Sequence, residues 1–166
     1  MDTNQTAAGT HPPDAKRLSL FLARLVNSLF VVRFLSTLNV FMYRVSGGRL
    51  MNNVDGTPVC LITMTRRKSG KRKTIALMYV PHGEEVLLVA SLGGSDRNPA
   101  WYYNLKADPN VDVQVGNRKR QLSAHEVSPS GRDTYWPRVV AAFPSYADYQ
   151  KKTTRVLPIF VCSPRG

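Results

Sequence analysis

Six short segments of β-forming residues follow one another through the C-terminal two thirds of the chain, and they constrain the fold more than any other feature. Each segment is rich in β-branched or apolar residues and is bounded by turn residues. Six strands within about 100 residues predict one closed or nearly closed β-barrel, and a chain of 166 residues suits a single domain. The expected strands are Val59–Thr65, Thr74–Val80, Glu85–Ser91, Val111–Val115, Arg118–Val127 and Val156–Cys162.

Glycine-containing turns connect two pairs of these strands. Pro81-His82-Gly83 is expected to form the turn between the second and third strands. Gly116-Asn117 is expected to form a tight hairpin turn between the fourth and fifth strands. Together with two helices, these elements predict an α+β protein that is mainly β.

The two helices are predicted from their start signals. Asn98 is a good helix cap, and Pro99 costs no hydrogen-bond donor at the first helical position, so a helix is expected over Ala100–Ala107. The second helix is expected over Gly131–Ala142, in which Pro137 indicates a later start or a kink.

An N-terminal arm precedes the barrel. Residues 1–15 are small and polar and are expected to be a disordered tail, whereas residues 16–48 are expected to be an amphipathic helical arm. Gly47-Gly48 is a plausible helix stop and hinge. The helical periodicity comes from apolar residues at steps of three and four, namely Leu18, Leu22, Leu25, Leu29, Val32 and Leu35.

Two interpretations of this arm stay open. Arg24 and Arg33 interrupt the apolar run, so no stretch approaches the roughly 20 apolar residues that a membrane-spanning helix needs, and we expect no secretory signal. The arm then either packs on the barrel or on a second subunit, or lies on an anionic membrane surface. In the second case the cations that would meet the lipid are Lys16, Arg17, Arg24 and Arg33.

The charge favours an anionic partner. Lys and Arg number 23 against 11 Asp and Glu, a formal net charge of +12, which suits nucleic acid, an acidic membrane face or a phosphorylated ligand. Cys60 and Cys162 lie in apolar runs and are expected to be buried thiols, which fits a cytoplasmic compartment. No metal site is expected, because no Cys/His cluster has zinc-ligand spacing and the three histidines, His11, His82 and His125, are scattered.

The basic segment Arg66–Lys73 is the densest chemical signal. Six of its eight residues are cationic, Ser-Gly lies at its centre, and it falls between two expected strands. A glycine turn there would gather backbone N–H groups, and the surrounding cations would complete an anion cradle. Phosphate binding, a nucleic-acid patch and a solvated hairpin tip all remain open from the residues alone.

Three further segments could line a ligand site. The glycines of Ala90–Ser95 allow close approach of a flat ligand or simply form a connection. In the following helix Trp101 and Leu105 are expected in the core, while Asn104 could face a ligand. Tyr146 and Tyr149, three residues apart, would share one face of a helical turn and either wall a ligand or pack with their hydroxyls at the surface.

Taken in order, these segments resemble the deazaflavin-dependent nitroreductase family of actinobacteria. The resemblance covers about two thirds of the chain, from Pro58 onward, and several linked motifs are more specific than any one of them. It rests on TMTRRKSGKRKTIALMY (63–79), ASLGGSDRNPAWYYNL (90–105), ADPNVDVQV (107–115), FPSYADYQ (143–150) and the closing run 157–162.

The resemblance implies a split β-barrel of the flavin-reductase, FMN-binding-like kind over residues 49–166. It implies coenzyme F-420, an 8-hydroxy-5-deazaflavin with a phosphate and an oligoglutamate tail. The residues that it assigns to the phosphate and tail are Arg67, Lys68, Ser69, Gly70 and Lys73. Those that it assigns to the ribityl chain, the ring and the rest of the pocket are Thr74, Leu77, Met78, Tyr79, Ala90, Ser91, Gly93, Gly94, Ala100, Trp101 and Asn104.

The chain departs from the family pattern at three places. Arg66 stands where the loop usually has Gly, Arg72-Lys73 stands where Pro-Arg is usual, and Leu92 replaces a Lys that some members carry. The second change would turn a bidentate phosphate contact into a point charge.

The expected activity is hydride transfer from the reduced coenzyme to an apolar, electron-poor acceptor. The resemblance suggests quinones, activated nitro compounds, and enones or unsaturated lactones; a lipid quinone would agree with an arm on the inner face of the cell membrane. Tyr146 and Ser91 are the hydroxyl donors expected to stabilise charge on the acceptor or deliver a proton, with Tyr149 beside Tyr146 on the acceptor side.

Three alternatives remain. The first is a reductase that uses flavin mononucleotide, and the second is a barrel that sequesters the coenzyme without turnover. The third, a nucleic-acid-binding barrel, is not expected, because the aromatic residues cluster on predicted helices and the arm and not on a strand face. We expect a monomer or a homodimer.

Overall fold

A computed structural model describes residues 38–54 and 56–165 of the chain. Residues 38–45 form a helix. The remaining helices are η1 (Pro129–Gly131), α2 (Ala100–Ala107), α3 (Arg132–Ala142) and α4 (Ser145–Lys151). The strands are β1 (Asn53–Val54), β2 (Thr57–Thr65), β3 (Arg72–Met78), β4 (Val80–His82), β5 (Glu85–Val89), β6 (Asn110–Val115), β7 (Arg118–Glu126) and β8 (Ile159–Pro164).

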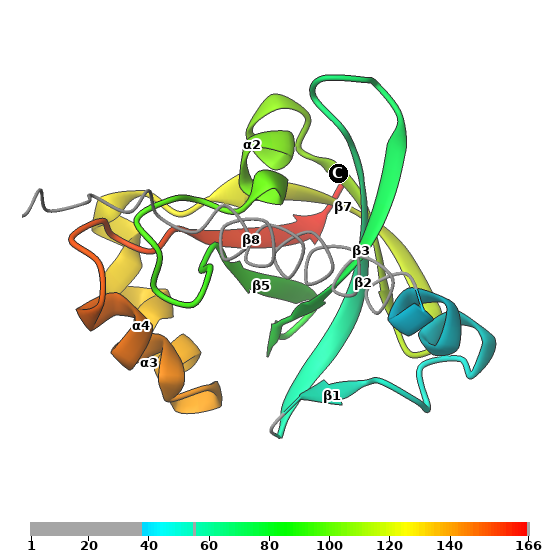
Figure 1. The fold of residues 1–166 in the computed structure, drawn as a ribbon, viewed down its shortest axis with the longest axis horizontal. Coiled ribbons are helices and arrows are strands. Elements are labelled where there is room, and N and C mark those ends of the chain that lie inside the picture. Colours follow the sequence, from blue (N-terminus) through cyan, green and yellow to red (C-terminus); the bar gives the residue numbers. More distant parts are fainter. Residues whose placement is uncertain (1–37, 55, 166) are drawn as a thin grey trace, which may run out of the picture. The chain divides into compact units, whose positions relative to one another are not determined.

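One antiparallel sheet curls into a split β-barrel (Figure 1). Its strands follow the order β1-β2-β6-β7-β8-β5-β4, with β3 on the other edge of β2. The two ends of this curl are the consecutive strands β3 and β4, which are separated only by Tyr79. The Tyr79 N–H still donates to the Pro58 carbonyl at 3.0 Å, and the chain then passes from β2 to β5. The barrel is therefore closed by the chain itself and not by a ladder between β3 and β4.

Alternating side chains fill the barrel interior. Cys60, Ile62 and Met64 of β2 meet apolar residues of β5, β6, β7 and β8 in one buried cluster. Trp101 and Leu105 of α2 belong to the same cluster, and the Trp101 ring packs edge-on against Phe160 at 5.9 Å. The expected core role of both α2 residues is confirmed.

Both cysteines are buried, as predicted. Burial raises the pKa of Cys60 far above its usual range and that of Cys162 to about 12. We therefore expect both thiols to be protonated and slow to react in the folded protein.

Helices cover two parts of the outer surface. α3 and α4 pack Val139, Phe143 and Tyr146 against the outward side chains of β5 and β8, such as Leu87 and Ile159. This arrangement places α4 against the outer face of the sheet.

The helix of residues 38–45 covers β2 and β3 through Tyr43. The Tyr43 side chain is 1% exposed. Its hydroxyl donates to the Val59 carbonyl at 3.0 Å and accepts from the Gly116 N–H at 2.9 Å. This buried phenol joins the helix to β2 and to the β6–β7 turn.

The predicted helix stop at Gly47-Gly48 is confirmed. Gly47 donates to the Arg44 carbonyl and Gly48 to the Tyr43 carbonyl, both with positive φ, which is a glycine-terminated helix end. A Cβ on Gly48 would lie 2.5 Å from the Gly116 Cα, so this end fits tightly on the hairpin turn. The earlier part of the predicted arm, residues 16–37, and the predicted tail lie outside the described residues.

Several boundaries differ from the sequence-based expectation. Pro81 and His82 belong to β4, so the turn falls at Gly83 and Glu84. The expected Thr74–Val80 strand starts at Arg72 and breaks at Tyr79 because the chain changes partners there.

The closing strand is also shifted. It runs over Ile159–Pro164 and not Val156–Cys162. The residues before it are held by side chains, since Leu157 donates its N–H to Gln150 and accepts from Arg132. The second helix begins at Arg132 and continues through Pro137.

Candidate functional site

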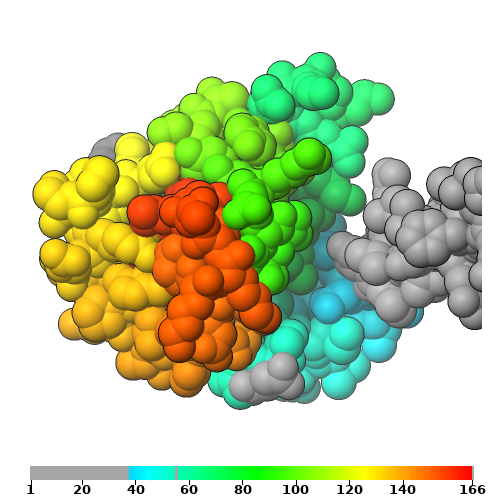
Figure 2. Space-filling view, turned by 60° about the vertical axis from the view of Figure 1, so that its left-hand side comes forward, coloured from blue at the N-terminus to red at the C-terminus, as the bar shows by residue number. Residues whose placement is uncertain are grey.

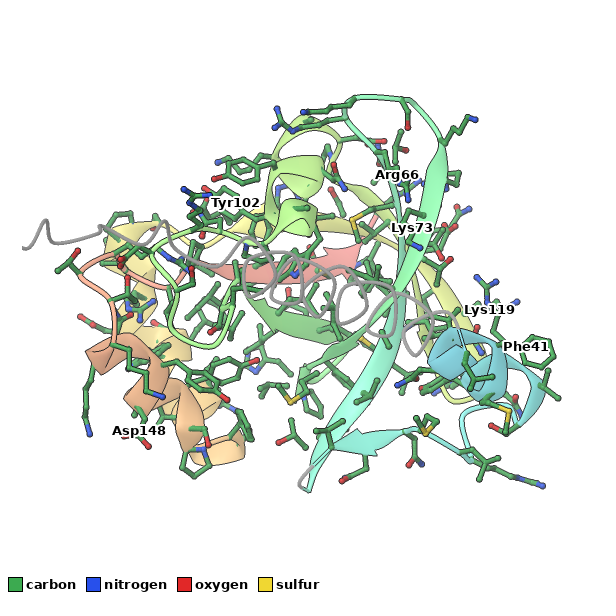
Figure 3. The ribbon with its side chains drawn as sticks, viewed as in Figure 1. Phe41, Arg66, Lys73, Tyr102, Lys119 and Asp148 are labelled. Atoms are coloured by element: carbon green, nitrogen blue, oxygen red, sulfur yellow. The ribbon has the colours of Figure 1, made fainter. Side chains whose placement is uncertain are left out.

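A cleft of about 820 Å³ lies between the β2–β3 loop and α2. It brings together the basic segment and the aromatic segment, which are some thirty positions apart in sequence. Figure 3 shows Arg66 at the β2–β3 loop and Lys73 below it on β3. The lining residues are Met64, Arg66, Arg67, Lys68, Ser69, Lys73, Ile75, Asn98, Ala100, Trp101, Tyr103 and Asn104.

The loop itself is a tight, self-bonded turn. The Arg66 carbonyl accepts from Ser69 and Gly70, and the Arg67 N–H donates to the Asn104 Oδ1 at 3.2 Å. Gly70 has a φ of +65°, which suits a residue without a Cβ. The amides of Arg66, Arg67, Ser69 and Gly70, which were expected to help cradle an anion, therefore already donate within the protein. An anion in the cleft would meet side chains instead.

The charge that lines the cleft is entirely positive. Arg66, Arg67, Lys68 and Lys73 line it, and no carboxylate among the described residues does. Within residues 38–54 and 56–165, none of the four takes part in an ion pair. The Arg67 guanidinium lies 5.3 Å from the centre of the Tyr103 ring, a cation–π contact at the mouth of the cleft.

Arg72 has a different environment from its neighbour Lys73. Its guanidinium donates to the Asp112 carboxylate and to the Thr63 carbonyl, on the other side of the sheet. Arg72 therefore does not replace the arginine that the family pattern places one position later, and Lys73 is the cation that β3 contributes to the cleft.

Side chains of β3 alternate between the two faces of the sheet. Ile75 and Leu77 pack on the barrel interior, whereas Met78 packs on the outer clusters. The Thr74 Oγ1 lies 2.8 Å from the Thr63 Oγ1 and accepts from Arg44. The side chains of Thr74 and Met78 thus face away from the cleft.

The backbone of β3 is available on one edge. Tyr79 donates to Pro58, so the alternation of an antiparallel ladder directs the backbone groups of Leu77 and Ile75 toward β2. The groups of Met78, Ala76 and Thr74 then face the opposite edge, and β3 pairs with β2 alone among the described strands. That edge offers hydrogen-bond donors and acceptors to a ligand.

The loop of residues 90–98 connects β5 to α2 and contains Ser91, Gly93 and Gly94. The Ser91 Oγ is buried and has no hydrogen-bond partner among the described residues. Gly93 faces open space, whereas a Cβ on Gly94 would lie 2.8 Å from the Lys152 Cβ and 3.0 Å from the Tyr149 carbonyl. Gly94 therefore permits the loop to pack on α4, and Figure 2 shows the loop (green) beside α4 (orange).

Tyr146 and Tyr149 share one face of α4, as predicted. Their ring centroids are 6.0 Å apart in an edge-to-face arrangement. Tyr146 is 5% exposed, and burial, with a contribution from Tyr149, raises its pKa to about 12. Its hydroxyl is thus a proton donor and not a base at neutral pH. Neither tyrosine lines the cleft.

Sequence reasoning missed several residues of this region. Asn98 does not cap α2; Pro99 is the N-cap, and the Asn98 Oδ1 accepts from Arg155 at 2.6 Å. Met64, Ile75 and Tyr103 line the cleft and were not singled out. Met64 pairs with Lys73, and Ile75 lies two residues after Lys73 on the same strand. Because side chains alternate along a strand, all three share one face, and this alternation could have identified Met64 and Ile75.

Comparison with known proteins identifies the relatives of this chain. The model of the F420H(2)-dependent quinone reductase family matches residues 35–164. The chain belongs to this family. An F420H(2)-dependent quinone reductase of Mycobacterium tuberculosis is 35% identical over 128 residues, which is 75% of this chain and 86% of that protein.

Solved structures agree with this assignment. A reductase described as dependent on reduced F-420 is 40% identical, with a TM-score of 0.60, over 64% of this chain and 94% of its own. A second, described as a domain-swapped dimer, is 35% identical, with a TM-score of 0.62, over 82% of this chain and 99% of its own.

The family confirms the expected cofactor class, coenzyme F-420, and the expected enzyme class, a reductase that transfers hydride to a quinone-type acceptor. Three observations fit the coenzyme. All charged residues that line the cleft are cationic, and among the described residues the Ser91 Oγ has no partner and one edge of β3 is unpaired. Ser91 itself does not line the cleft.

The described part of the chain contains no group of three potential metal ligands. Among the described helices, none has the length and apolar character needed to cross a membrane.

Proposed function

We propose that this family member holds reduced coenzyme F-420 between the β2–β3 loop, β3 and the loop of residues 90–98, and reduces an apolar quinone beside α4. The four cations that line the cleft carry this proposal. A ligand with a phosphate and several carboxylates needs such a lining, and a neutral ligand does not.

The cations at the cleft would hold the anionic part of the coenzyme. Arg67, Lys68 and Lys73, with Ser69 and Gly70 in the turn, are the proposed phosphate and tail ligands; Arg66 adds a further charge where the family usually has glycine. Ala100, Trp101 and Asn104 would form the α2 wall.

The free edge of β3 would hold the polar rim of the ring. The backbone of Thr74 and Met78 supports this role, while Leu77 would contact the ring through its side chain and Tyr79 would lie at its end. On the opposite side, the proposed ring contacts are Ala90, Ser91, Gly93 and Gly94.

When bound, the reduced coenzyme supplies the hydride. The protein orients donor and acceptor and stabilises the charge that develops on the acceptor oxygen. Tyr146 suits a hydrogen-bond donor role because its hydroxyl is protonated at neutral pH, and the Ser91 Oγ has no competing partner among the described residues. Tyr149 would wall the acceptor side and fix the ring of Tyr146 by edge-to-face contact.

The acceptor is proposed to be a quinone, with nitro compounds and enones as further acceptors of similar polarity. The experiment is an equilibrium titration of the purified protein with reduced and oxidised coenzyme F-420, with flavin mononucleotide as the control, followed by turnover with the three acceptor classes. We expect tighter binding of the deazaflavin and the fastest turnover with quinones. Preferential binding of flavin mononucleotide would contradict the proposal.

The Tyr146 role has its own test. Removing one transition-state donor costs roughly a hundred- to a thousandfold in rate. Tyr146→Phe should lower kcat on this scale without weakening coenzyme binding, whereas Tyr135→Phe, on α3 and not among the residues that line the cleft, should leave kcat unchanged. An unchanged kcat in Tyr146→Phe would remove Tyr146 from this role.

We also propose that the barrel docks on an anionic membrane surface through the end of the N-terminal helix. Leu38, Phe41 and Val45 lie on one helical face and are 43%, 59% and 71% exposed, and Leu50 and Met51 extend this apolar patch. Figure 3 shows Phe41 and Lys119 at the same end of the molecule. Exposed cations at this end include Arg44, Arg49, Arg118 and Lys119.

Vesicle sedimentation tests this second proposal. Phe41→Ser should reduce binding to vesicles with anionic lipid and leave turnover with a water-soluble quinone intact. Equal binding of wild type and Phe41→Ser would exclude this surface.

We further propose a homodimer, which light scattering after gel filtration would test; a monomer at all concentrations would contradict it.

A further inference from the structure

One guanidinium holds the loop of residues 90–98 in place. Arg155 follows α4 and lies before β8, and its side chain spans the loop from its first residue to its last. We infer that Arg155 is a positioning residue of the reductase site: it fixes Ser91 and the start of α2 relative to α4. This inference rests on the proposed function, because it takes the loop to be one wall of the coenzyme site.

The contacts of Arg155 are numerous and specific. Nε donates to the Ser95 carbonyl at 2.9 Å and Nη1 to the Asn98 Oδ1 at 2.6 Å. Nη2 donates to the Ala90 carbonyl at 3.0 Å and to the Arg97 carbonyl at 3.2 Å. All four acceptors are neutral oxygens, so the arrangement is not an ordinary ion pair. The contacts instead fix the shape of the loop, because the planar guanidinium donates to several oxygens at once.

Neighbouring side chains hold Arg155 itself. Gln150 of α4 donates from Nε2 to the Arg155 carbonyl at 2.8 Å, and its Oε1 accepts from the Leu157 N–H at 2.9 Å and from Arg132 at 3.1 Å. The Thr153 hydroxyl donates to the Asp96 carboxylate, and the Arg155 N–H donates to Thr153. The backbone of Arg155 is thus bonded to α4, while its guanidinium is bonded to the loop.

The positions that Arg155 fixes are the ones that the site needs. Ser91 directly follows the bonded Ala90, and its buried hydroxyl has no partner within residues 38–54 and 56–165. Asn98, at the other end of the loop, lines the cationic cleft. Gly94 packs closely on Lys152 and Tyr149, so the loop also contacts α4 directly. Arg155 therefore links the proposed acceptor wall to the proposed coenzyme wall.

Arg155→Lys and Arg155→Ala test the inference, with Arg138→Ala as the matched control. Arg138 is exposed on α3, and the described residues give its side chain no hydrogen bond or ion pair. A lysine keeps the charge but offers three donors on one atom, which cannot span four separated acceptors. Both Arg155 variants should lower kcat roughly ten- to a hundredfold at saturating coenzyme, because small displacements of reacting groups cost rates of this size.

Amide hydrogen exchange separates this role from general destabilisation. In the free protein, exchange of residues 91–98 should be faster in Arg155→Lys than in wild type, while exchange in β2, β6 and β7 stays unchanged. Millimolar methylguanidine should restore part of the kcat of Arg155→Ala and leave Arg138→Ala unaffected.

Two results would overturn the inference. One is unchanged exchange over residues 91–98 in Arg155→Lys, and the other is faster exchange there with an unaltered kcat. Failure of the proposed function is a separate observation, since it would appear as wild-type protein that binds no coenzyme while the exchange difference persists.

Discussion

The two neighbouring cations on β3 should contribute unequally to coenzyme binding. Lys73 lines the cleft, whereas Arg72 donates to Asp112 on the other side of the sheet. We predict that Lys73→Met weakens binding of coenzyme F-420 and that Arg72→Met does not. Each change lowers the net charge of the protein by one unit, so any effect of long-range electrostatic attraction on coenzyme binding is the same in the two variants.

The expected size follows from the position of each group. A hydrogen bond from an ammonium to a phosphate contributes about 1.5–3 kcal/mol, and solvent in an open cleft reduces this to about 1–2 kcal/mol. At 1.4 kcal/mol per tenfold change in affinity, Lys73→Met should raise the Kd by about five- to thirtyfold. The Arg72–Asp112 pair has side chains that are 45% and 43% exposed, so its loss should cost less than about 1 kcal/mol of stability.

Equilibrium titration at several salt concentrations measures both effects. The salt dependence of binding should be shallower in Lys73→Met than in wild type and unchanged in Arg72→Met, because only the first removes a cation that meets the ligand. Equal losses of affinity in the two variants would refute the reasoning, since they would mean that the net charge and not the cleft attracts the coenzyme.

Three further predictions concern the scaffold. Tyr43→Phe should lower the free energy of unfolding in urea by about 1–3 kcal/mol, because the Val59 carbonyl and the Gly116 N–H lose a buried partner; Tyr103→Phe is the control, and equal effects would contradict the anchor. Gly94→Ala should lower both the melting temperature and kcat, since its φ is +84° and its Cβ would meet Lys152, whereas Gly93→Ala should pay only the strain of a positive φ; identical effects would refute the packing role. Cys60 and Cys162 should stay unmodified by a thiol reagent at pH 8 until urea unfolds the protein, because burial raises both pKa values and the thiolate is therefore scarce below them; fast labelling of native protein would contradict this.

The sequence was sufficient to predict the elements that depend on local patterns. Alternating apolar residues placed the barrel strands, and glycine at Gly47-Gly48 and Gly116 placed a helix end and a hairpin. The basic loop and the aromatic helix were recognised as site segments, and they do line one cleft.

The remaining features depend on contacts between distant segments. The break at Tyr79 results from a change of strand partner, which no local pattern encodes. Asparagine is a common helix cap, but the Asn98 side-chain oxygen accepts a hydrogen bond from the Arg155 guanidinium and not from the helix. The amides of the basic loop close their own turn, which depends on how Arg66 and Asn104 meet in space.

The last strand of the barrel lies in the middle of its sheet. β8 pairs with β7 on one side and with β5 on the other, joining residues as far apart in sequence as Val86 and Cys162. During synthesis, β5 and β7 must therefore wait with exposed edges until residues 159–164 leave the ribosome. Such distant pairing also makes closure of the barrel a slow step in folding. The nascent chain is consequently most prone to aggregation just before β8 is synthesised.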